Sequence, residues 1–294
     1  MAKTELGIAL NTAFGTKIED RMDHVLGAGF TNVSMVWGET EEEREKFRRQ
    51  AHYIKERGVP VFSVHAPLYP TPFTDLGIGV MWESGEAAKT YRDLLCRCAR
   101  EVAEHTGAPY LVVHPTFAPT MPAPTEAGAE NFLYVAQYCR EVGIMMALET
   151  MEVPSHLAYL LKNIPADLAG VCWDSGHNQA YTPDVNWPKE AAGRILCTHL
   201  HDNRGKTMGP IPNTLCDTHF LPFDGIRDWE SAMVDLAESG YRGPLTLEVK
   251  KGRDICEQLP IYAEWGEERF MKEAYTRADR LRKIYEETCR RLDS

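Results

Sequence analysis

Six short apolar segments of the sequence each end in a histidine or a carboxylate side chain. The segments are VFSVHAP, YLVVHPT, IMMALET, GVCWDSGH, ILCTHLHD and PLTLEVK, and the polar residues are His65, His114, Glu149, Asp174, His199 and Glu248. One such residue after an apolar run is more often a cap or a turn residue than a ligand. The repetition at six segment ends favours a shared metal site. Mixed imidazole and carboxylate ligands suit Mn²⁺, Zn²⁺, Co²⁺ or Fe²⁺, whereas Ca²⁺ prefers oxygen ligands alone.

Two of these residues, Glu149 and Glu248, are carboxylates that directly follow apolar segments. A buried carboxylate is unfavourable unless it is paired or bound to a metal. Two carboxylates at one metal also offer a proton-transfer pair, because the metal polarises a substrate carbonyl or hydroxyl group while a carboxylate moves the proton. We therefore expect both glutamates to be metal ligands and catalytic residues.

More polar residues surround the segments that end in Asp174 and His199. His177 lies three residues after Asp174, and the run HLHDN from His199 to Asn203 precedes an Asp217-Thr-His219 pair. A solvated polar loop is the alternative interpretation of that pair. The remaining histidines fall on helical patterns and are expected at the surface: His24, His52, His105 and His156.

The segments that carry these residues alternate with longer amphipathic ones. Strand patterns are expected over Leu6–Leu10, Thr31–Val36, Val59–Val64, Tyr110–Val113, Ile144–Leu148, Leu168–Trp173, Arg194–Thr198 and Leu245–Leu247. Helical patterns are expected over Ile18–Leu26, Glu41–Arg57, Glu86–Thr106, Thr125–Val142, Ser155–Asn163, a segment after Gly176, Trp229–Ser239 and Phe270–Arg291. Several of the helices end at a glycine, which is a stop signal.

Eight strands that alternate with helices predict a parallel sheet with right-handed crossovers. Eight such units favour an α/β fold, a single (β/α)8 TIM barrel with a long C-terminal helix, and no linker divides residues 1–294. No GxGxxG follows the first strand, which disfavours a dinucleotide-binding fold. The carboxyl ends of barrel strands converge on one rim, so the six polar residues should meet there. The long segments Ala66–Gly85, Pro115–Pro124 and His201–Arg227 should form loops on the same face.

The composition is that of an ordinary soluble globular protein. The 294 residues are 44% hydrophobic and 26% charged, and the formal net charge of −11 disfavours loose binding to nucleic-acid phosphates. No apolar run approaches the roughly 20 residues of a membrane span, and no signal peptide pattern begins the sequence. The eight cysteines include no CxxC pair, so we expect reduced thiols in a cytoplasmic protein. The absence of GxSxG and P-loop motifs argues against Ser-triad hydrolysis and nucleotide-triphosphate chemistry.

The set of motifs resembles the xylose isomerase-like barrel superfamily, which includes sugar isomerases and epimerases and the endonuclease IV type of abasic-site nuclease. The resemblance covers nearly the whole chain and rests on VHAP, VVHP, ALET, CWDSGH, THLHDN, DTHFLPFDG and LEVK. For the ketose epimerases it implies one divalent metal, proton exchange by both glutamates, sugar contact by His177, and the ligands Glu149, Asp174, His199 and Glu248. For the endonucleases it implies three zinc ions and nine ligands: His65, His114, Glu149, Asp174, His177, His199, Asp217, His219 and Glu248.

These ligand sets do not separate the two classes, so the choice rests on the loops. No lysine or arginine lies between His65 and Lys89, although Leu68 and Tyr69 could act as a wedge. A nuclease needs basic side chains to grip a bent duplex. We therefore expect a metal-dependent sugar or sugar phosphate isomerase or epimerase that acts on a small molecule and uses neither nucleic acid nor a membrane. An endonuclease IV-like phosphodiester hydrolase and an inosose dehydratase-type lyase are the alternatives.

Further expectations concern the metal and the substrate contacts. We expect Mn²⁺ or Zn²⁺ as the metal, and Co²⁺, Fe²⁺ and Mg²⁺ are left open. A homo-oligomer is also left open. Substrate contacts are expected from His65, His114, His177 and Arg204. Candidates for binding a substrate phosphate are Arg204, Lys206 and Arg227. Additional metal binding or a second layer around the metal is left open for His65, His114, His177, Asp217 and His219. By analogy with sugar-active relatives, we expect His65, His114, Asp217 and His219 to form a second layer around one metal rather than further metal sites.

Overall fold

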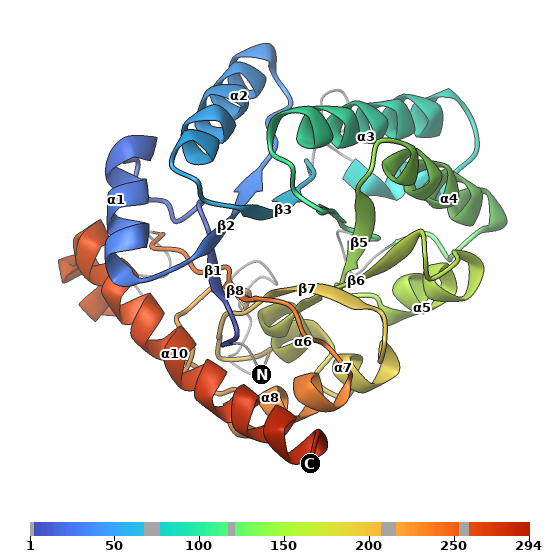
Figure 1. Cartoon of the computed structure of the whole chain (residues 1–294). Coiled ribbons are helices and arrows are strands. Elements are labelled where there is room, and N and C mark those ends of the chain that lie inside the picture. Colours follow the sequence, from blue (N-terminus) through green and yellow to red (C-terminus); the bar gives the residue numbers. More distant parts are fainter. Residues whose placement is uncertain (1–2, 68–76, 117–120, 207–215, 253–258) are drawn as a thin grey trace. The chain divides into compact units, whose positions relative to one another are not determined.

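The computed structural model describes residues 3–67, 77–116, 121–206, 216–252 and 259–294, and within them eight strands alternate with helices (Figure 1). The strands are β1 (Leu6–Ala9), β2 (Asn32–Val36), β3 (Val61–His65), β4 (Tyr110–Val113), β5 (Met145–Glu149), β6 (Ala169–Asp174), β7 (Ile195–His199) and β8 (Leu245–Leu247). They form one sheet in the order β7-β6-β5-β4-β3-β2-β1-β8, and the strand pairs run parallel. This is the strand order of a TIM barrel, as the sequence predicts.

The longer helices fall where the sequence predicts them, with shifts at their ends, but the short helices Trp187–Glu190, Gly77–Trp82 and Pro260–Glu264 were not predicted from the sequence. They are α1 (Ile18–Ala28), α2 (Glu41–Glu56), α3 (Glu86–His105), α4 (Glu126–Glu141), α5 (Pro154–Asn163), α6 (Ser175–Tyr181), α7 (Trp187–Glu190), α8 (Trp229–Glu238) and α10 (Glu267–Leu292), with short 3-10 helices η1 (Gly77–Trp82) and η3 (Pro260–Glu264). Helix α6 begins before Gly176, because the Asp174 side chain caps it by accepting a hydrogen bond from the His177 backbone at 2.6 Å. Helix α10 begins at Glu267 rather than at Phe270.

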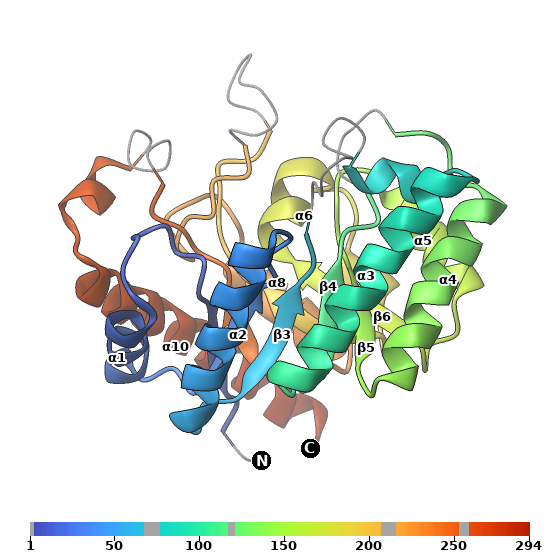
Figure 2. The ribbon, with the colours of Figure 1, turned by 90° about the horizontal axis from the view of Figure 1, so that it is seen from above.

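The described residues divide into two compact units, whose boundaries fall inside β2 and β6. One unit comprises residues 35–172, and the other comprises residues 1–34 and 173–294. In the 35–172 unit, β3, β4 and β5 pair in register, with His65 opposite Val112. Helices α3 and α4 pack side by side in this unit (Figure 2). The pairing brings the carboxyl ends of three strands to the same edge.

His156 on α5 is buried, so the expectation that it lies at the surface is wrong. Only 2% of the residue is exposed, and its ring lies edge-on to Trp82 with 4.6 Å between ring centroids. Its Nε2 donates to the Pro122 carbonyl oxygen at 2.7 Å, and burial lowers its pKa. Periodicity identifies the apolar face of a helix but not the segments that cover its other faces.

In the second unit, β1 pairs with both β2 and β8, and α10 packs against α1 and α8 (Figure 1). The packed side of α10 is apolar, and its buried residues include Phe270, Met271, Ala274, Ala278 and Leu281. The seven cysteines within the described residues are free and buried. Of the helices in this described part, none has the length and apolarity needed to cross a membrane.

A buried glutamate, Glu267, fixes the loop that follows β1. Its carboxylate accepts hydrogen bonds from Thr16 Oγ1 at 2.6 Å and from Arg21 Nε at 2.8 Å. Arg21 also donates to the Leu10 carbonyl oxygen at 2.8 Å. Burial alone would raise the pKa of Glu267, but the hydrogen bonds from Thr16 and Arg21 lower it below its ordinary value. The loop held in this way carries Asn11, so this buried network supports the end of β8 described below.

We predict that Glu267→Gln lowers the free energy of unfolding by about 2 kcal/mol at neutral pH, because hydrogen bonds to a charged group contribute roughly 1.5–3 kcal/mol. Urea unfolding followed by circular dichroism measures this. Since the folded-state pKa lies below the ordinary value of 4.5, the stabilisation is complete above that pH and is lost as the pH falls through the folded-state pKa.

The matched control for this prediction is Glu268→Gln, because Glu268 is the next residue and its side chain is exposed. It should change the free energy of unfolding by less than about 0.5 kcal/mol. Equal effects of the two substitutions, or a Glu267→Gln effect that grows on acidification, would contradict the assignment.

Candidate metal centre

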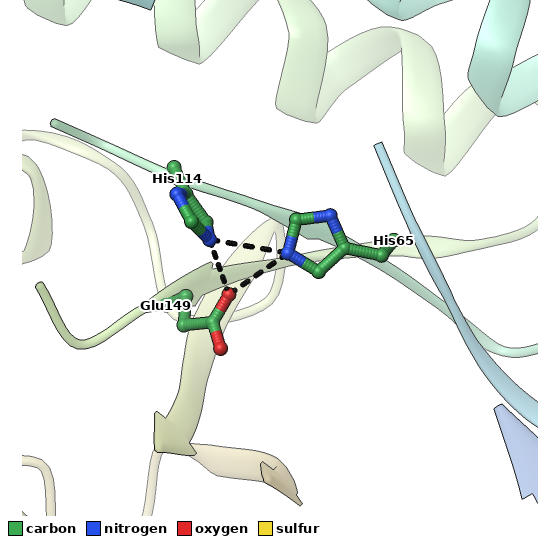
Figure 3. Close-up of side chains that lie close together, drawn as sticks. All are labelled: His65, His114 and Glu149. Carbon is green, nitrogen blue, oxygen red and sulfur yellow. Dashed lines mark hydrogen bonds and ion pairs between the residues drawn. The ribbon is translucent and has the colours of Figure 1, made fainter. Parts of the chain in front are cut away.

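The first cluster of metal-capable side chains lies in the 35–172 unit and consists of His65, His114 and Glu149, which point toward one another (Figure 3). His65 ends β3, His114 follows β4 and Glu149 ends β5. The two imidazole Nε2 atoms are 3.1 Å apart. The Nε2 of His65 lies 3.0 Å from Glu149 Oε2, and that of His114 lies 2.7 Å from the same oxygen. Glu149 is fully buried.

The chemistry of this Glu149 cluster fits a divalent metal. His65 Nδ1 lies 2.6 Å from the Ala66 carbonyl oxygen, which can only accept, so Nδ1 carries the hydrogen. In the neutral ring, His65 Nε2 therefore presents a lone pair to a carboxylate oxygen of Glu149. Two acceptors at this separation require a proton or a metal between them. Ligand atoms of a tetrahedral site with bonds of about 2.1 Å lie roughly 3.4 Å apart, close to the spacings here.

The second cluster, in the other unit, surrounds Asp174 at the end of β6. The Nε2 of His201 lies 3.0 Å from Asp174 Oδ1 and 3.1 Å from Oδ2. The backbone N–H of His177 donates to Oδ1, and the ring nitrogen Nδ1 of His177 lies 3.8 Å from the same oxygen. Asp174 and His201 are both fully buried. The cap of α6 and the segment after β7 therefore meet at one carboxylate.

A third cluster lies beside the second and is centred on Asp217. Its Oδ2 is 3.2 Å from His177 Nε2 and 3.1 Å from His219 Nε2. Burial would raise the pKa of Asp217, but the neighbouring His219 and His177 hold it well below its ordinary value. The rings of His201 and His219 stack with 4.0 Å between centroids. The Asp217 cluster thus joins the long loop to α6 and to the segment after β7.

At the carboxyl end of β8, Glu248 faces His199 and Lys250. Its Oε2 lies 3.1 Å from His199 Nδ1, and its Oε1 lies 3.5 Å from Lys250 Nζ. Asn11 Nδ2 donates to Oε1 at 3.2 Å. Burial would raise the pKa of Glu248, but Lys250 and His199 hold it well below its ordinary value. The carboxylate is therefore charged and held by three different segments of its unit.

Comparison with known proteins shows the family of the chain. The family profile described as "Xylose isomerase-like TIM barrel" matches residues 22–274. The chain belongs to this family. It is 27% identical over 280 residues to the uncharacterized protein y4fM of Sinorhizobium fredii, across 83% of this chain and 85% of that protein.

Solved structures of the family have the same fold. L-ribulose 3-epimerase matches with a TM-score of 0.72 and 16% identity, over 100% of this chain and 97% of that one. A xylose isomerase-like TIM barrel/4-hydroxyphenylpyruvate dioxygenase fusion protein matches with a TM-score of 0.69 and 17% identity, over 86% of this chain. This chain spans 40% of the length of that fusion protein. At these identities the likeness concerns the fold alone.

Two residues of the clusters were not among the predicted site residues. His201 contacts Asp174, and Lys250 contacts Glu248. Each lies two positions beyond a predicted ligand, His199 and Glu248 respectively. Side chains two apart in an extended chain point to the same face, so this spacing could have identified both.

Arg227, a candidate for phosphate binding, packs against the start of α6. Its side chain is half-buried, lies over the rings of Trp173 and Trp229, and donates to the Ser175 carbonyl oxygen at 2.7 Å. Burial lowers its pKa to about 10. It therefore anchors the first turn of α6, which carries His177. Of the other two phosphate candidates, Lys206 is exposed, and Arg204 lies 5.8 Å from the Phe220 ring centroid.

The predicted four-ligand shell takes Glu149 from one unit and Asp174, His199 and Glu248 from the other, and it remains a prediction. The substrate contacts of His65, His114, His177 and Arg204 are likewise untested. Parts of the three predicted loops, residues 68–76, 117–120 and 207–215, lie outside the described residues, as does the suggested wedge of Leu68 and Tyr69.

Gly176, the second residue of α6, makes room for His201. A Cβ added at Gly176 would lie 1.8 Å from His201 Cε1. The ring cannot retreat easily, because Ser175 Oγ donates to the His201 carbonyl oxygen at 2.8 Å and accepts from its N–H at 3.0 Å. The β6–α6 turn therefore admits His201 only with glycine at position 176.

We predict that Gly176→Ala destabilises the protein by about 1–3 kcal/mol, the range for overpacking a well-packed interior. It should also weaken Zn²⁺ binding, since His201 must move away from Asp174. Urea unfolding and competition with a chromophoric chelator measure the two effects. Gly27→Ala in α1 is the control: no described atom outside the local helix lies within 4 Å of its added Cβ. Alanine there should stabilise by up to about 1 kcal/mol. Indistinguishable stabilities of the two variants would refute the packing argument.

Proposed function

We propose that the protein is a metal-dependent sugar isomerase or epimerase. The observation that carries the proposal is a buried glutamate, at a strand end of each unit, whose carboxylate oxygen faces an imidazole nitrogen. In the 35–172 unit this is Glu149 with His65 and His114, and in the other unit it is Glu248 with His199. A buried acid of this kind is a candidate for proton transfer as well as for metal binding.

In this proposal the metal ligands are Glu149, Asp174, His199 and Glu248, as the family resemblance implies. Carboxylates and imidazoles suit Mn²⁺ or Zn²⁺. When bound, the metal would hold and polarise the carbonyl and the adjacent hydroxyl of a substrate. His65, His114, His177 and Arg204 would contact the sugar, since imidazole and guanidinium groups can hydrogen-bond to hydroxyls.

The glutamates would move the protons. One carboxylate removes the carbon-bound proton next to the substrate carbonyl. The other returns a proton to the opposite face for epimerisation, or the proton moves to the neighbouring carbon for exchange between aldose and ketose. The structural likeness to L-ribulose 3-epimerase supports a ketose as the first substrate class to test. The alternative function, an inosose dehydratase-type lyase, differs from an isomerase or epimerase in the mass of its product, which is lower than that of the substrate by one water.

We predict that Glu149→Gln and Glu248→Gln each retain much of the metal but lose on the order of 10²–10⁴ in rate, because an amide oxygen can bind a metal but cannot serve as a base. The assay follows solvent deuterium into a panel of ketoses and aldoses by NMR. Chelation should abolish exchange, and Mn²⁺ or Zn²⁺ should restore it. Glu45→Gln, on the exposed side of α2, is the matched control. A Gln variant that binds metal and exchanges at the wild-type rate would show that its glutamate is not the base.

A phosphodiester hydrolase remains the second candidate because of one observation. The Glu149 cluster and the Asp217 cluster, with His177 and His219, contain six of the residues that the endonuclease resemblance assigns to zinc. The net charge of −11 and the stretch without lysine or arginine after His65 oppose this reading, since duplex binding depends on basic contacts to phosphates.

We therefore predict no metal-dependent nicking of an abasic duplex at physiological salt, measured on a fluorescent oligonucleotide with zinc or manganese added. Nicking that survives in Glu45→Gln and disappears in Glu149→Gln would reverse the ranking of the two functions.

A further inference from the structure

Lys250 occupies an unusual place among the metal-capable residues. It lies two positions after Glu248, on the same side of the extended chain, while Val249 between them is fully buried. The Nζ of Lys250 is 3.0 Å from His219 Nε2 and 3.5 Å from Glu248 Oε1. Its backbone N–H donates to the His219 carbonyl oxygen at 3.1 Å. Both its main chain and its ammonium group are therefore tied to the Asp217 cluster.

The hydrogen bonds of His219 determine which of its ring nitrogens carries the hydrogen and which has a free lone pair. Nδ1 lies 2.8 Å from the Glu248 carbonyl oxygen, which only accepts, so Nδ1 carries the hydrogen. Nε2 then has one lone pair in the plane of the ring. The ammonium of Lys250 has only hydrogens to donate, and it lies at hydrogen-bond distance from this nitrogen. A metal ion bound by His219 would need the same lone pair.

The two oxygens of Asp217 differ in their surroundings. Oδ1 makes no hydrogen bond within the described residues and lies 3.6 Å from His201 Nε2, whereas Oδ2 lies between the rings of His177 and His219. His177 Nε2 lies 3.2 Å from Asp217 Oδ2 and can donate to it. His219 Nε2 lies 3.1 Å from that oxygen. In a metal site Asp217 and His219 would be ligands of one cation, with His201 as a third candidate. Here an ammonium already brings a positive charge to the nitrogen that such a cation would use.

We propose that the Lys250 ammonium takes the place of a divalent cation at the Asp217–His219 pair, so that this pair holds no metal when the protein is otherwise loaded with zinc. The chain would then contain the full set of residues for three metals but fill fewer sites. Asp217 and His177 would be left to bind an uncharged polar ligand such as a sugar hydroxyl. The number of metal ions bound by the chain is independent of the proposed isomerase activity.

The test is the zinc content of the whole chain in the absence of substrate. Wild type, Lys250→Met and Lys250→Arg are dialysed against the same buffered free zinc concentration, and bound zinc is measured by plasma mass spectrometry. We expect Lys250→Met to bind one more equivalent than wild type, because Asp217 and His219 become free to coordinate beside His201. Lys250→Arg keeps the cation and should match wild type. Lys272→Met, an exposed lysine on α10, is the matched control and should also match wild type.

Two further variants identify the extra site. Lys250→Met combined with Asp217→Asn should lose the added equivalent, whereas Asp217→Asn alone should leave the zinc content of wild type unchanged. If Asp217→Asn alone removes one equivalent, wild type already fills this site and the proposal is overturned, even if Lys250→Met does not fold. An unchanged zinc content in folded Lys250→Met overturns it equally. Wild type that binds no zinc would count against the proposed function, but the difference between the variants would still test Lys250.

Discussion

The arrangement of this protein follows from the need to neutralise carboxylates that lie beneath its surface. Glu149 and Asp174 are fully buried, and Glu248 is 7% exposed. A carboxylate withdrawn from water is strongly unfavourable unless hydrogen bonds or opposite charges replace its hydration. Each of the three therefore has a basic nitrogen beside it, from His114, His201 and His199 respectively. The strand ends, the Asp174 cap of α6 and Gly176 position those nitrogens beside the carboxylates.

The extended segments after β7 and β8 each place two polar side chains on the same side. Alternate residues of an extended chain share a face, so His201 follows His199, and Lys250 follows Glu248, onto the same side. The intervening residues Leu200 and Val249 are buried on the other side. Asp202, the next residue of the HLHDN run, accepts hydrogen bonds from Trp229 Nε1 and from loop N–H groups. In the HLHDN motif, the histidines therefore belong to the clusters, whereas the aspartate holds the loop.

The sequence predicts the strand-end clusters better than their surroundings. His65, His114 and Glu149 come together because neighbouring parallel strands end at one edge, a consequence of topology that periodicity reveals. The burial of His156 and the partial burial of Arg227 could not be predicted, because each depends on a segment distant in sequence: Trp82 for the first and Trp173 for the second. The early start of α10 depends likewise on Glu267, whose partners Thr16 and Arg21 lie near the other end of the chain.

The contact between Gly176 and His201 has a consequence for the comparison of related chains. The histidine ring fills the volume that any side chain at position 176 would need. A chain that keeps histidine at 201 must therefore keep glycine at 176, whereas a chain with a smaller residue at 201 is released from that restriction. The two positions should vary together during evolution, and the residue found at 176 then reports whether an imidazole is available to the neighbouring aspartate.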